Sequence, residues 1–428
     1  MTNPSVLNSG AVRRGAALAA AGLLAAGVAA CGSSSKASSA SPTTSGAGGG
    51  AQSTAAAAAA TGSPIKIMAF GQFQASTFSY PEGQTAIDAA AKSINAAGGI
   101  NGHPLKVEVC NDQGDPNVAA QCARQAVSNG DVAVLGSYSQ NAGQVLPILQ
   151  AANIAYVGAT AQSVTDTTSS VSFPLEGLNQ VVFGGVGYGA TLAGCKKAGI
   201  LIENYGTTTP LAIQSITNGI ELGGGQIVKV ENTGTNLPDY SPAISAIESA
   251  GGQCVATIMP PDQIAEVFQA MRQSAQPNIT MINAQDTFST QLLQQLGSTA
   301  NGMILSSSTY PPTDTSIPEV SKVVAAIKQY EPGAAISQFS IQGWAAMLLL
   351  QDVVKNISGD VTSAAVLNGF EHLTNASTNG LYPPYTTTSA GPVPNAPRIF
   401  LTKVLILKYQ GGDETPVSNG FVNVIKGG

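Results

Sequence analysis

The stretch that decides the fold runs from Gly83 to Ala126 and reads GQTAIDAAAKSINAAGGINGHPLKVEVCNDQGDPNVAAQCARQA. Its first part carries apolar residues at the spacing of one buried helical face, namely Ile87, Ala90, Ala91 and Ile94. This spacing predicts an amphipathic helix. We expect the helix to end at Gly98-Gly99, because glycine readily adopts the left-handed conformation found after helix C-termini.

The second part of the stretch predicts a strand and then another helix. Leu105, Val107 and Val109 alternate with other residues in the manner of a β-strand. Asp115 then precedes Pro116; aspartate caps free helix amides, and proline suits the first helical position. The stretch is therefore a helix, strand, helix segment of an α/β protein. Open sheets of this class bind ligands at the carboxyl ends of their strands.

Strand-like and helix-like segments alternate through the rest of the chain. We expect a first series of strands at 65–70, 105–110, 132–135 and 154–157, and a second at 200–203, 226–230, 255–259, 279–282 and 303–305. Helical patterns at 319–330, 339–357 and 361–373 precede final strands at 400–409 and 421–425. Two such series predict an α/β fold with two doubly wound parallel-sheet lobes and a cleft between them.

The N-terminus has the pattern of a bacterial export signal. Arg13 and Arg14 precede an apolar run at 16–30, which predicts a signal peptide over residues 1–30. Val28-Ala29-Ala30-Cys31 resembles a lipobox, so we expect Cys31 to carry lipid; the alternative is an ordinary signal peptide with a chance cysteine. Residues 31–62 are mostly Ala, Gly, Ser and Thr and predict a flexible linker.

Charge and histidine content narrow the range of functions. The chain has 18 basic and 24 acidic residues, a net charge of −6, and no basic cluster, so we expect no nucleic-acid partner. With two histidines and no GxSxG motif, it lacks the elements of a serine hydrolase. Gly185 to Ala190 forms a GxGxxA pattern ahead of Glu203, which suggests either a dinucleotide site or a glycine-rich helix. We expect no cofactor.

Four cysteines remain beyond Cys31, an even number in an exported chain. Two disulfides are therefore expected, with three connectivities open. Cys110 ends a strand and Cys122 lies in the next helix, while Cys195 and Cys254 each precede a strand of the second series. We expect Cys110 to pair with Cys122 and Cys195 with Cys254. Zinc is the competing interpretation, but the sequence has no CxxC motif, and we expect no metal site.

The segment INAAGGINGHPLKVEVCNDQGDPNVAAQ, together with the strand IKIMAFG before it, carries a family resemblance. It resembles the N-terminal signature of type I periplasmic solute-binding proteins, the branched-chain amino acid and amide binding family that serves ABC importers. The resemblance implies that the chain crosses between its lobes three times. Lobe one would comprise 63–176 with 311–398, and lobe two 177–310 with 399–428.

The resemblance also implies where a ligand binds. In this family lobe one holds the ligand's carboxylate after its third and fourth strands, and an acid in lobe two holds the ammonium. Carried onto this sequence, with aromatic walls added, the expected ligand-binding residues are Phe73, Tyr80, Ser139, Gln140, Asn141, Ala159, Thr160, Tyr205, Gln285, Asp286 and Phe339. The family's acid aligns near Asn283-Ala284-Gln285-Asp286, so either Gln285 occupies that place or Asp286 is displaced by one residue.

These observations give one main hypothesis of function. We expect a monomeric, lipid-anchored receptor outside the cell membrane that captures a small polar ligand by cleft closure and delivers it to an ABC permease. The ligand would be a branched-chain amino acid, an amide or a related metabolite. A ligand sensor without transport and a cell-envelope enzyme on the same α/β frame are the alternatives.

Overall fold

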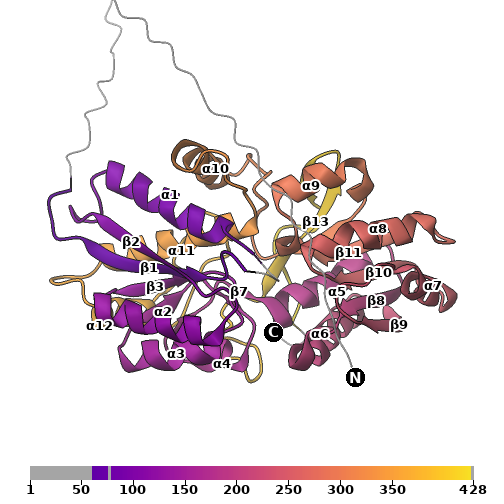
Figure 1. Ribbon diagram of the computed structural model, residues 1–428, viewed down its shortest axis with the longest axis horizontal. Coiled ribbons are helices and arrows are strands. Elements are labelled where there is room, and N and C mark those ends of the chain that lie inside the picture. Colours follow the sequence, from indigo (N-terminus) through magenta and orange to yellow (C-terminus); the bar gives the residue numbers. More distant parts are fainter. Residues whose placement is uncertain (1–59, 76–78, 426–428) are drawn as a thin grey trace, which may run out of the picture. The chain divides into compact units, whose positions relative to one another are not determined.

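The computed structural model describes residues 60–75 and 79–425, which all belong to one compact unit, Ala56–Gly428. The expected signal peptide, the expected lipid site at Cys31 and most of the expected linker lie outside the described residues. Two β-sheets, each flanked by helices, make up the described part, and a pair of two-residue strands lies at a connection between them. They form the two lobes of an α/β fold (Figure 1).

The first lobe is built on a five-stranded parallel sheet of order β2-β1-β3-β4-β6. Its strands are β1 (Ile65–Gly71), β2 (Leu105–Asn111), β3 (Ala133–Gly136), β4 (Ala155–Val157) and β6 (Ser172–Phe173). In β1 every residue except Lys66 is buried, as expected of a central parallel strand covered on both faces.

Helices from both halves of the sequence cover this first sheet. They are α1 (Glu82–Ala96), α2 (Pro116–Asn129), α3 (Ala142–Ala151), α4 (Val164–Thr168), α10 (Pro318–Tyr330), α11 (Gln338–Lys355) and α12 (Ser363–Glu371). Helix α1 packs on α10 and α11, more than 200 residues later in the chain, as Figure 1 shows. The late helices therefore return to lobe one, and their residues share its hydrophobic core.

Local sequence signals set the ends of α1 and α2 as expected. Helix α1 ends at Ala96, and Gly98 and Gly99 follow it with positive φ angles of 97° and 76°, which glycine adopts readily. At the start of α2 the Asp115 carboxylate accepts hydrogen bonds from the amides of Asn117 and Val118 at 2.7 and 3.1 Å.

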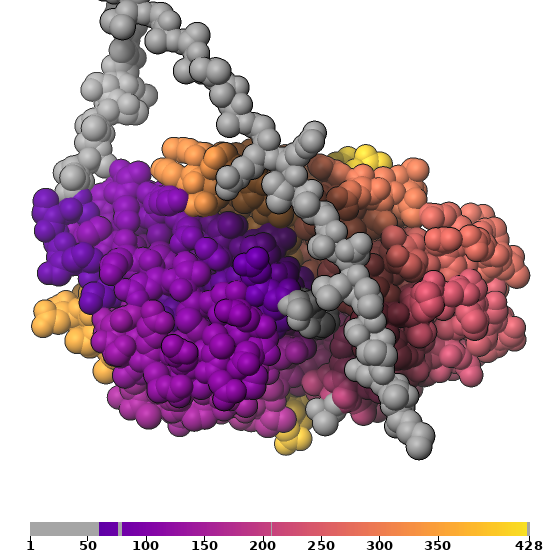
Figure 2. All heavy atoms as spheres, in the orientation of Figure 1, coloured from indigo at the N-terminus to yellow at the C-terminus, as the bar shows by residue number. Residues whose placement is uncertain are grey.

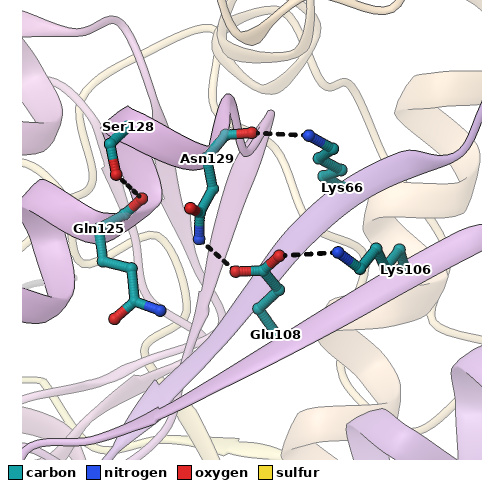
Figure 3. A network of polar contacts seen from close by, with 6 residues as sticks. All are labelled: Lys66, Lys106, Glu108, Gln125, Ser128 and Asn129. Atoms are coloured by element: carbon teal, nitrogen blue, oxygen red, sulfur yellow. Dashed lines mark hydrogen bonds and ion pairs between the residues drawn. The ribbon is translucent and has the colours of Figure 1, made fainter.

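Polar contacts fasten the C-terminal end of α2 to the sheet edge (Figure 3). Lys66 on β1 donates a hydrogen bond to the main-chain oxygen of Asn129 at 3.0 Å. The Asn129 side chain in turn contacts Glu108 on β2, which also pairs with Lys106 at 3.1 Å. These contacts lie on the surface of lobe one, so each contributes little to stability by itself.

The second lobe is built on an eight-stranded sheet of order β14-β13-β12-β11-β10-β8-β9, with β15 paired to β13. Its strands are β8 (Lys197–Glu203), β9 (Gln226–Thr233), β10 (Cys254–Ile258), β11 (Thr280–Ala284), β12 (Ile304–Ser307), β13 (Lys403–Gln410), β14 (Asp413–Pro416) and β15 (Val422–Asn423). The strands from β8 to β12 are parallel, but β13 is antiparallel to β12. The expected parallel sheet is thus present in β8 to β12. The late strand β13 runs in the opposite direction because β12 ends near the inter-lobe connections and β13 begins there.

The helices of lobe two are α5 (Phe183–Leu192), α6 (Thr209–Leu222), α7 (Ser241–Ser249), α8 (Ile264–Gln273) and α9 (Thr290–Leu296). Short helical turns join them: η1 (Leu178–Val182), η2 (Gly206–Thr208), η3 (Pro261–Gln263), η4 (Gln285–Thr287) and η5 (Gly297–Ala300). Figure 2 shows the red and orange surface of this lobe beside the indigo and magenta surface of lobe one.

The glycine pattern near residue 187 belongs to helix packing. A Cβ atom on Gly187 would lie 2.0 Å from the main-chain oxygen of Ile216 on α6. A Cβ on Gly219 would likewise lie 1.9 Å from the oxygen of Gly184 on α5. The glycines therefore let α5 and α6 approach closely. This accounts for the pattern without a dinucleotide and favours the glycine-rich helix between the two interpretations.

Both expected cysteine pairs are joined in the structure. Cys110 on β2 pairs with Cys122 on α2, with Cα atoms 5.7 Å apart. Cys195 pairs with Cys254 on β10, with Cα atoms 6.2 Å apart, because β8 and β10 are neighbouring strands. Each bridge therefore lies within one lobe, leaving the lobes free of a covalent link to each other beyond the chain itself.

We expect removal of the first bridge in a Cys110→Ser/Cys122→Ser variant to lower the free energy of unfolding by roughly 3 kcal/mol, since it closes a short loop in the unfolded chain. Urea denaturation of the oxidised protein and of the variant measures the difference. Equal unfolding midpoints with equal slopes would contradict this expectation.

Candidate functional site

A cavity of about 70 Å³ lies between the two lobes. Lobe one contributes Tyr80, Tyr138 and Gln162 to its wall. Lobe two contributes the remaining lining residues, which are Leu178, Asn179, Phe183, Tyr205, Thr208, Ala212, Ile258, Met259, Pro260, Asp286 and Thr287. The cavity is thus largely apolar and aromatic with a few polar groups, the usual character of a small-molecule site.

The strand topology explains why these side chains meet. Tyr138 follows β3, Tyr205 follows β8, Met259 follows β10 and Asp286 follows β11, each at the carboxyl end of a parallel strand. The carboxyl ends of the parallel strands in both sheets therefore face the same cavity. This is the place where open α/β sheets bind ligands.

Aromatic rings form the wall on the lobe-one side. The Tyr80 ring centroid lies 4.8 Å from that of Tyr138 and 4.5 Å from that of Phe339. Phe339 is buried, and its ring packs against that of Tyr80. Burial raises the pKa values of Tyr80 and Tyr138 above their ordinary value, so both hydroxyls stay neutral. A wall of neutral aromatic faces attracts apolar groups and cations alike.

Asp286 is the one ionisable acid among the described residues that line this cavity, and these include no lysine, arginine or histidine. Its side chain is 9% exposed. Burial raises the pKa of the Asp286 carboxyl well above its ordinary value, and the nearby Glu176 carboxyl raises it further. An ionised carboxylate in such a place is costly unless a cation pairs with it.

Glu176 lies behind the cavity, at the first connection between the lobes. The short strand β7 (Glu176–Gly177) pairs there with β5 (Thr160–Ala161). The Glu176 carboxylate accepts hydrogen bonds from Thr160 at 3.3 Å, from Ser308 and from Gln338. Ser308 follows β12, on the second connection, so one buried carboxyl joins two of the three connections. Burial raises the pKa of Glu176 to about 7.

The structure brings some of the expected ligand-binding residues to the cavity. Tyr80, Tyr205 and Asp286 line it, and Phe339 contacts the Tyr80 ring. Gln285, the alternative to Asp286, is fully buried and donates a hydrogen bond to Glu414 at 3.1 Å.

The expected carboxylate-binding turn after β3 lies outside the cavity lining. Ser139 and Asn141 are both buried and donate hydrogen bonds to the Asp112 carboxylate. Gln140 is exposed and donates to the Tyr138 hydroxyl at 3.3 Å. Because the side-chain donors of Ser139 and Asn141 are held by an internal anion, this turn does not present them to a ligand.

The other expected residues also lie away from the cavity lining. Phe73 packs in the core of lobe one, and Ala159 is buried beside Gly136. Thr160 bonds Glu176 and accepts a hydrogen bond from Gln342 at 3.0 Å. The structure places Thr160 at the inter-lobe connection.

Sequence reasoning missed several lining residues that have recognisable signals. Tyr138 lies inside the Ser137 to Asn141 turn, and Gln162 follows Thr160 by two positions. Asn179 and Phe183 belong to the segment examined only for its glycines. Asn179 donates a hydrogen bond to the Gln162 main-chain oxygen at 2.7 Å, a contact across the lobes that local sequence does not reveal.

The described residues contain no group of three or more His, Cys, Asp or Glu side chains placed to hold a metal ion. His103 and His372 each contact a main-chain oxygen on the exposed surface of lobe one, away from the cavity. Within residues 60–75 and 79–425, no helix combines the length and the apolar character needed to cross a membrane.

Two parallel-sheet lobes, three connections and an inter-lobe cavity define a type I periplasmic binding protein. The family model described as periplasmic binding protein matches residues 64–404. The chain belongs to this family.

The curated relatives that match the chain have low sequence identity to it. The chain is 25% identical over 219 residues to "Leu/Ile/Val-binding protein homolog 4" of Brucella abortus, a match that covers 46% of this chain and 51% of the relative. The chain thus spans about half the length of the curated relatives it matches.

Solved structures share the fold at low identity. A branched-chain amino acid transporter substrate-binding protein from Streptococcus pneumoniae, in complex with isoleucine, superposes with a TM-score of 0.67 at 15% identity, covering 84% of this chain and 99% of that one. A solute-binding protein from Rhodopseudomonas palustris, in complex with 3,4-dihydroxybenzoic acid, gives 0.67 at 17% identity, covering 85% and 98%.

The buried position of Glu176 predicts a pH dependence of stability. Its folded-state pKa of about 7 lies above the ordinary 4.5, so between these values the folded protein binds more protons than the unfolded chain. Stability contributed by the protonated carboxyl is fully present below pH 4.5 and is lost as the pH rises towards 7. We expect a Glu176→Gln variant to lose less stability than wild type over this range.

Thermal melts of both proteins at several pH values measure this difference. Asp360→Asn, a change of the same kind on an exposed loop of lobe one, is the control and should follow wild type. If the melting temperatures of wild type and Glu176→Gln change with pH in the same way, Glu176 is not the source of the pH dependence.

Proposed function

We propose that the protein is an extracytoplasmic receptor of the ABC-importer type that captures a small ligand carrying a cationic group. The observation that carries this proposal is the buried Asp286 carboxyl, which faces an aromatic cavity whose described lining contains no basic residue. A ligand cation supplies the missing counter-charge. The rings of Tyr80, Tyr138 and Tyr205 add cation–π attraction and apolar contact.

Cleft closure follows from the same arrangement. Tyr80 and Tyr138 belong to lobe one, whereas Tyr205 and Asp286 belong to lobe two, so a ligand in the cavity contacts both lobes at once. A ligand that touches both lobes binds the closed form more tightly than the open form. This difference in affinity drives closure.

The hydrogen bonds of the turn after β3, Ser139 to Asn141, help to define the class of ligand. An α-amino acid needs a partner for its carboxylate as well as for its ammonium. The side-chain donors of Ser139 and Asn141 are held by Asp112, and the cavity lining offers no arginine or lysine in their place. The lining therefore favours an amine without a carboxylate over a branched-chain amino acid.

The remaining parts of the proposal extend from the family. We propose that the receptor acts as a monomer, is anchored by lipid at Cys31, and delivers its ligand to an ABC permease. We retain the lobe boundaries of 63–176 with 311–398 and 177–310 with 399–428. Sensing without transport is compatible with the same cavity. An enzyme on this frame is less well supported, since both histidines lie away from the cavity.

An Asp286→Asn variant tests the cation site. We expect it to weaken the binding of a cationic ligand by about 2 to 5 kcal/mol, because the ligand's charge is left unpaired in a buried place. Calorimetric titration of wild type and variant with a panel of amines and amino acids measures the loss. Asp360→Asn serves as the control and should bind as wild type does.

The pH dependence of binding has a definite sign. Because burial and Glu176 raise the pKa of Asp286, ionising it for a cation becomes easier as the pH rises. Affinity for an ammonium ligand should therefore increase with pH towards neutrality and above, as long as the ligand stays protonated. An affinity that falls with rising pH, or unaltered binding in Asp286→Asn, would contradict the cation site.

Anchoring is tested separately. We expect Cys31→Ala to release the protein from the membrane fraction of cells, because the modified cysteine would hold the lipid. Fractionation followed by immunoblotting compares the variant with wild type. A variant that still sediments with membranes would show that another feature holds the protein there.

A further inference from the structure

A second cavity, of about 260 Å³, adjoins the first at Asp286. The two cavities share Tyr80, Asp286 and Thr287 as lining residues. The remaining walls of the second cavity come from Ser79 and Glu82 in lobe one, from Pro261, Asp262, Ser289 and Leu292 in lobe two, and from Ser337 before α11. A ligand that reaches past Asp286 therefore enters a second space, also bounded by both lobes.

This second cavity is acidic on both sides. Glu82 comes from the start of α1 in lobe one, while Asp262 in η3 and Asp286 in η4 come from lobe two. The described residues that line it include no lysine, arginine or histidine. Closing two acidic surfaces onto each other is unfavourable unless a positive charge lies between them.

Glu82 is the buried acid of this group with an unpaired oxygen. The residue is 7% exposed, and its Oε2 atom has no hydrogen-bond partner among the described residues. Burial raises the pKa of this carboxyl. A buried acceptor without a donor is unusual in a folded protein. Because Glu82 also lines the second cavity, a ligand with a donor group there is in a position to pair with this carboxyl once the side chain turns towards it.

The chemistry of the donor follows from what surrounds the cavity. No described cluster of three or more acid, histidine or cysteine side chains is placed to hold a metal ion, which favours an organic cation. Tyr80 lines the second cavity together with both Asp286 and Glu82. Its ring offers an apolar surface to a carbon chain that joins two cationic ends.

We propose that the ligand is an elongated aliphatic diamine or polyamine, with one ammonium group at Asp286 and the second between Glu82 and Asp262. This inference rests on the proposed function and specifies the class of ligand. Glu82 and Asp262 then act as specificity-determining residues. They stabilise the second ammonium group of the ligand, whereas Asp286 binds the first.

The test compares 1,4-diaminobutane with n-butylamine, two probes that share a four-carbon chain and differ by one ammonium group. Calorimetric titration of the wild-type mature protein should show tighter binding of the diamine, by roughly 30-fold or more, because the buried Glu82 carboxyl gains a charge partner. In Glu82→Gln we expect the affinity for the diamine to fall towards that for the monoamine. Binding of n-butylamine should change little, because its single charge stays at Asp286.

Two further variants show whether a change in binding comes from the lost charge or from a disturbed fold. Asp262 is exposed, so Asp262→Asn leaves the fold intact and should reduce the preference for the diamine in part. Asp360→Asn removes a charge from the surface of lobe one away from both cavities and should leave the preference unchanged. If Glu82→Gln does not fold, the wild-type preference and the Asp262→Asn effect still decide the matter.

The outcomes separate this inference from the proposed function. Equal affinity for both probes, with both weakened in Asp286→Asn, would overturn the second cationic site while supporting a receptor for monovalent cations. Failure of both probes and of longer polyamines to bind would overturn the inference, and the Asp286 titrations with other amines would then decide the proposed function separately. A diamine preference unaltered in both Glu82→Gln and Asp262→Asn would also overturn it.

Discussion

The ligand-binding cavity is governed by the Asp286 carboxyl, which is buried and has no basic residue beside it in the cavity lining. Its surroundings are aromatic and apolar, and Glu176 adds a second negative group nearby. Alone, such a carboxyl lowers its cost by taking up a proton. A ligand cation removes the cost in another way, by pairing with the ionised form. The raised pKa of Asp286 favours the protonated carboxyl in the empty site, whereas a bound cation favours the ionised form, so ligand binding is linked to proton release.

The connections between the lobes are organised around a related feature. Glu176 accepts hydrogen bonds from Thr160, from Ser308 on the second connection, and from Gln338 at the start of α11. These contacts define one arrangement of the hinge. The disulfides lie within the lobes and leave the hinge unconstrained. Lobes that each have their own core and disulfide, with polar contacts at the connections between them, suit a receptor that opens and closes around its ligand.

The sequence predicted the elements well where the signals were local. The apolar spacing in α1, the glycines after it and the Asp115-Pro116 cap of α2 each act over a few residues, and the structure confirms them. The family resemblance predicted the return of the late helices to lobe one, which periodicity alone could not. The direction of β13, antiparallel to β12, had no local signal because strand direction depends on where the chain re-enters the sheet.

The site was harder to predict because its chemistry depends on tertiary contacts. Ser139 and Asn141 have the right side chains for an anion, but Asp112, far from them in sequence, holds both. Tyr138, their neighbour, lines the cavity instead. The acidic character of the second cavity arises only when Glu82 and Asp262, from different lobes, come together. No local pattern in the sequence signals such a pairing.

The central claim is that the cleft selects a positively charged ligand. Native mass spectrometry of the gently purified protein tests it most directly, because a receptor of this kind retains its ligand when closed. The account predicts a bound mass that, after release and fragmentation, identifies an amine with at least one cationic group. Recovery of an organic anion, such as an aromatic carboxylate, would contradict it.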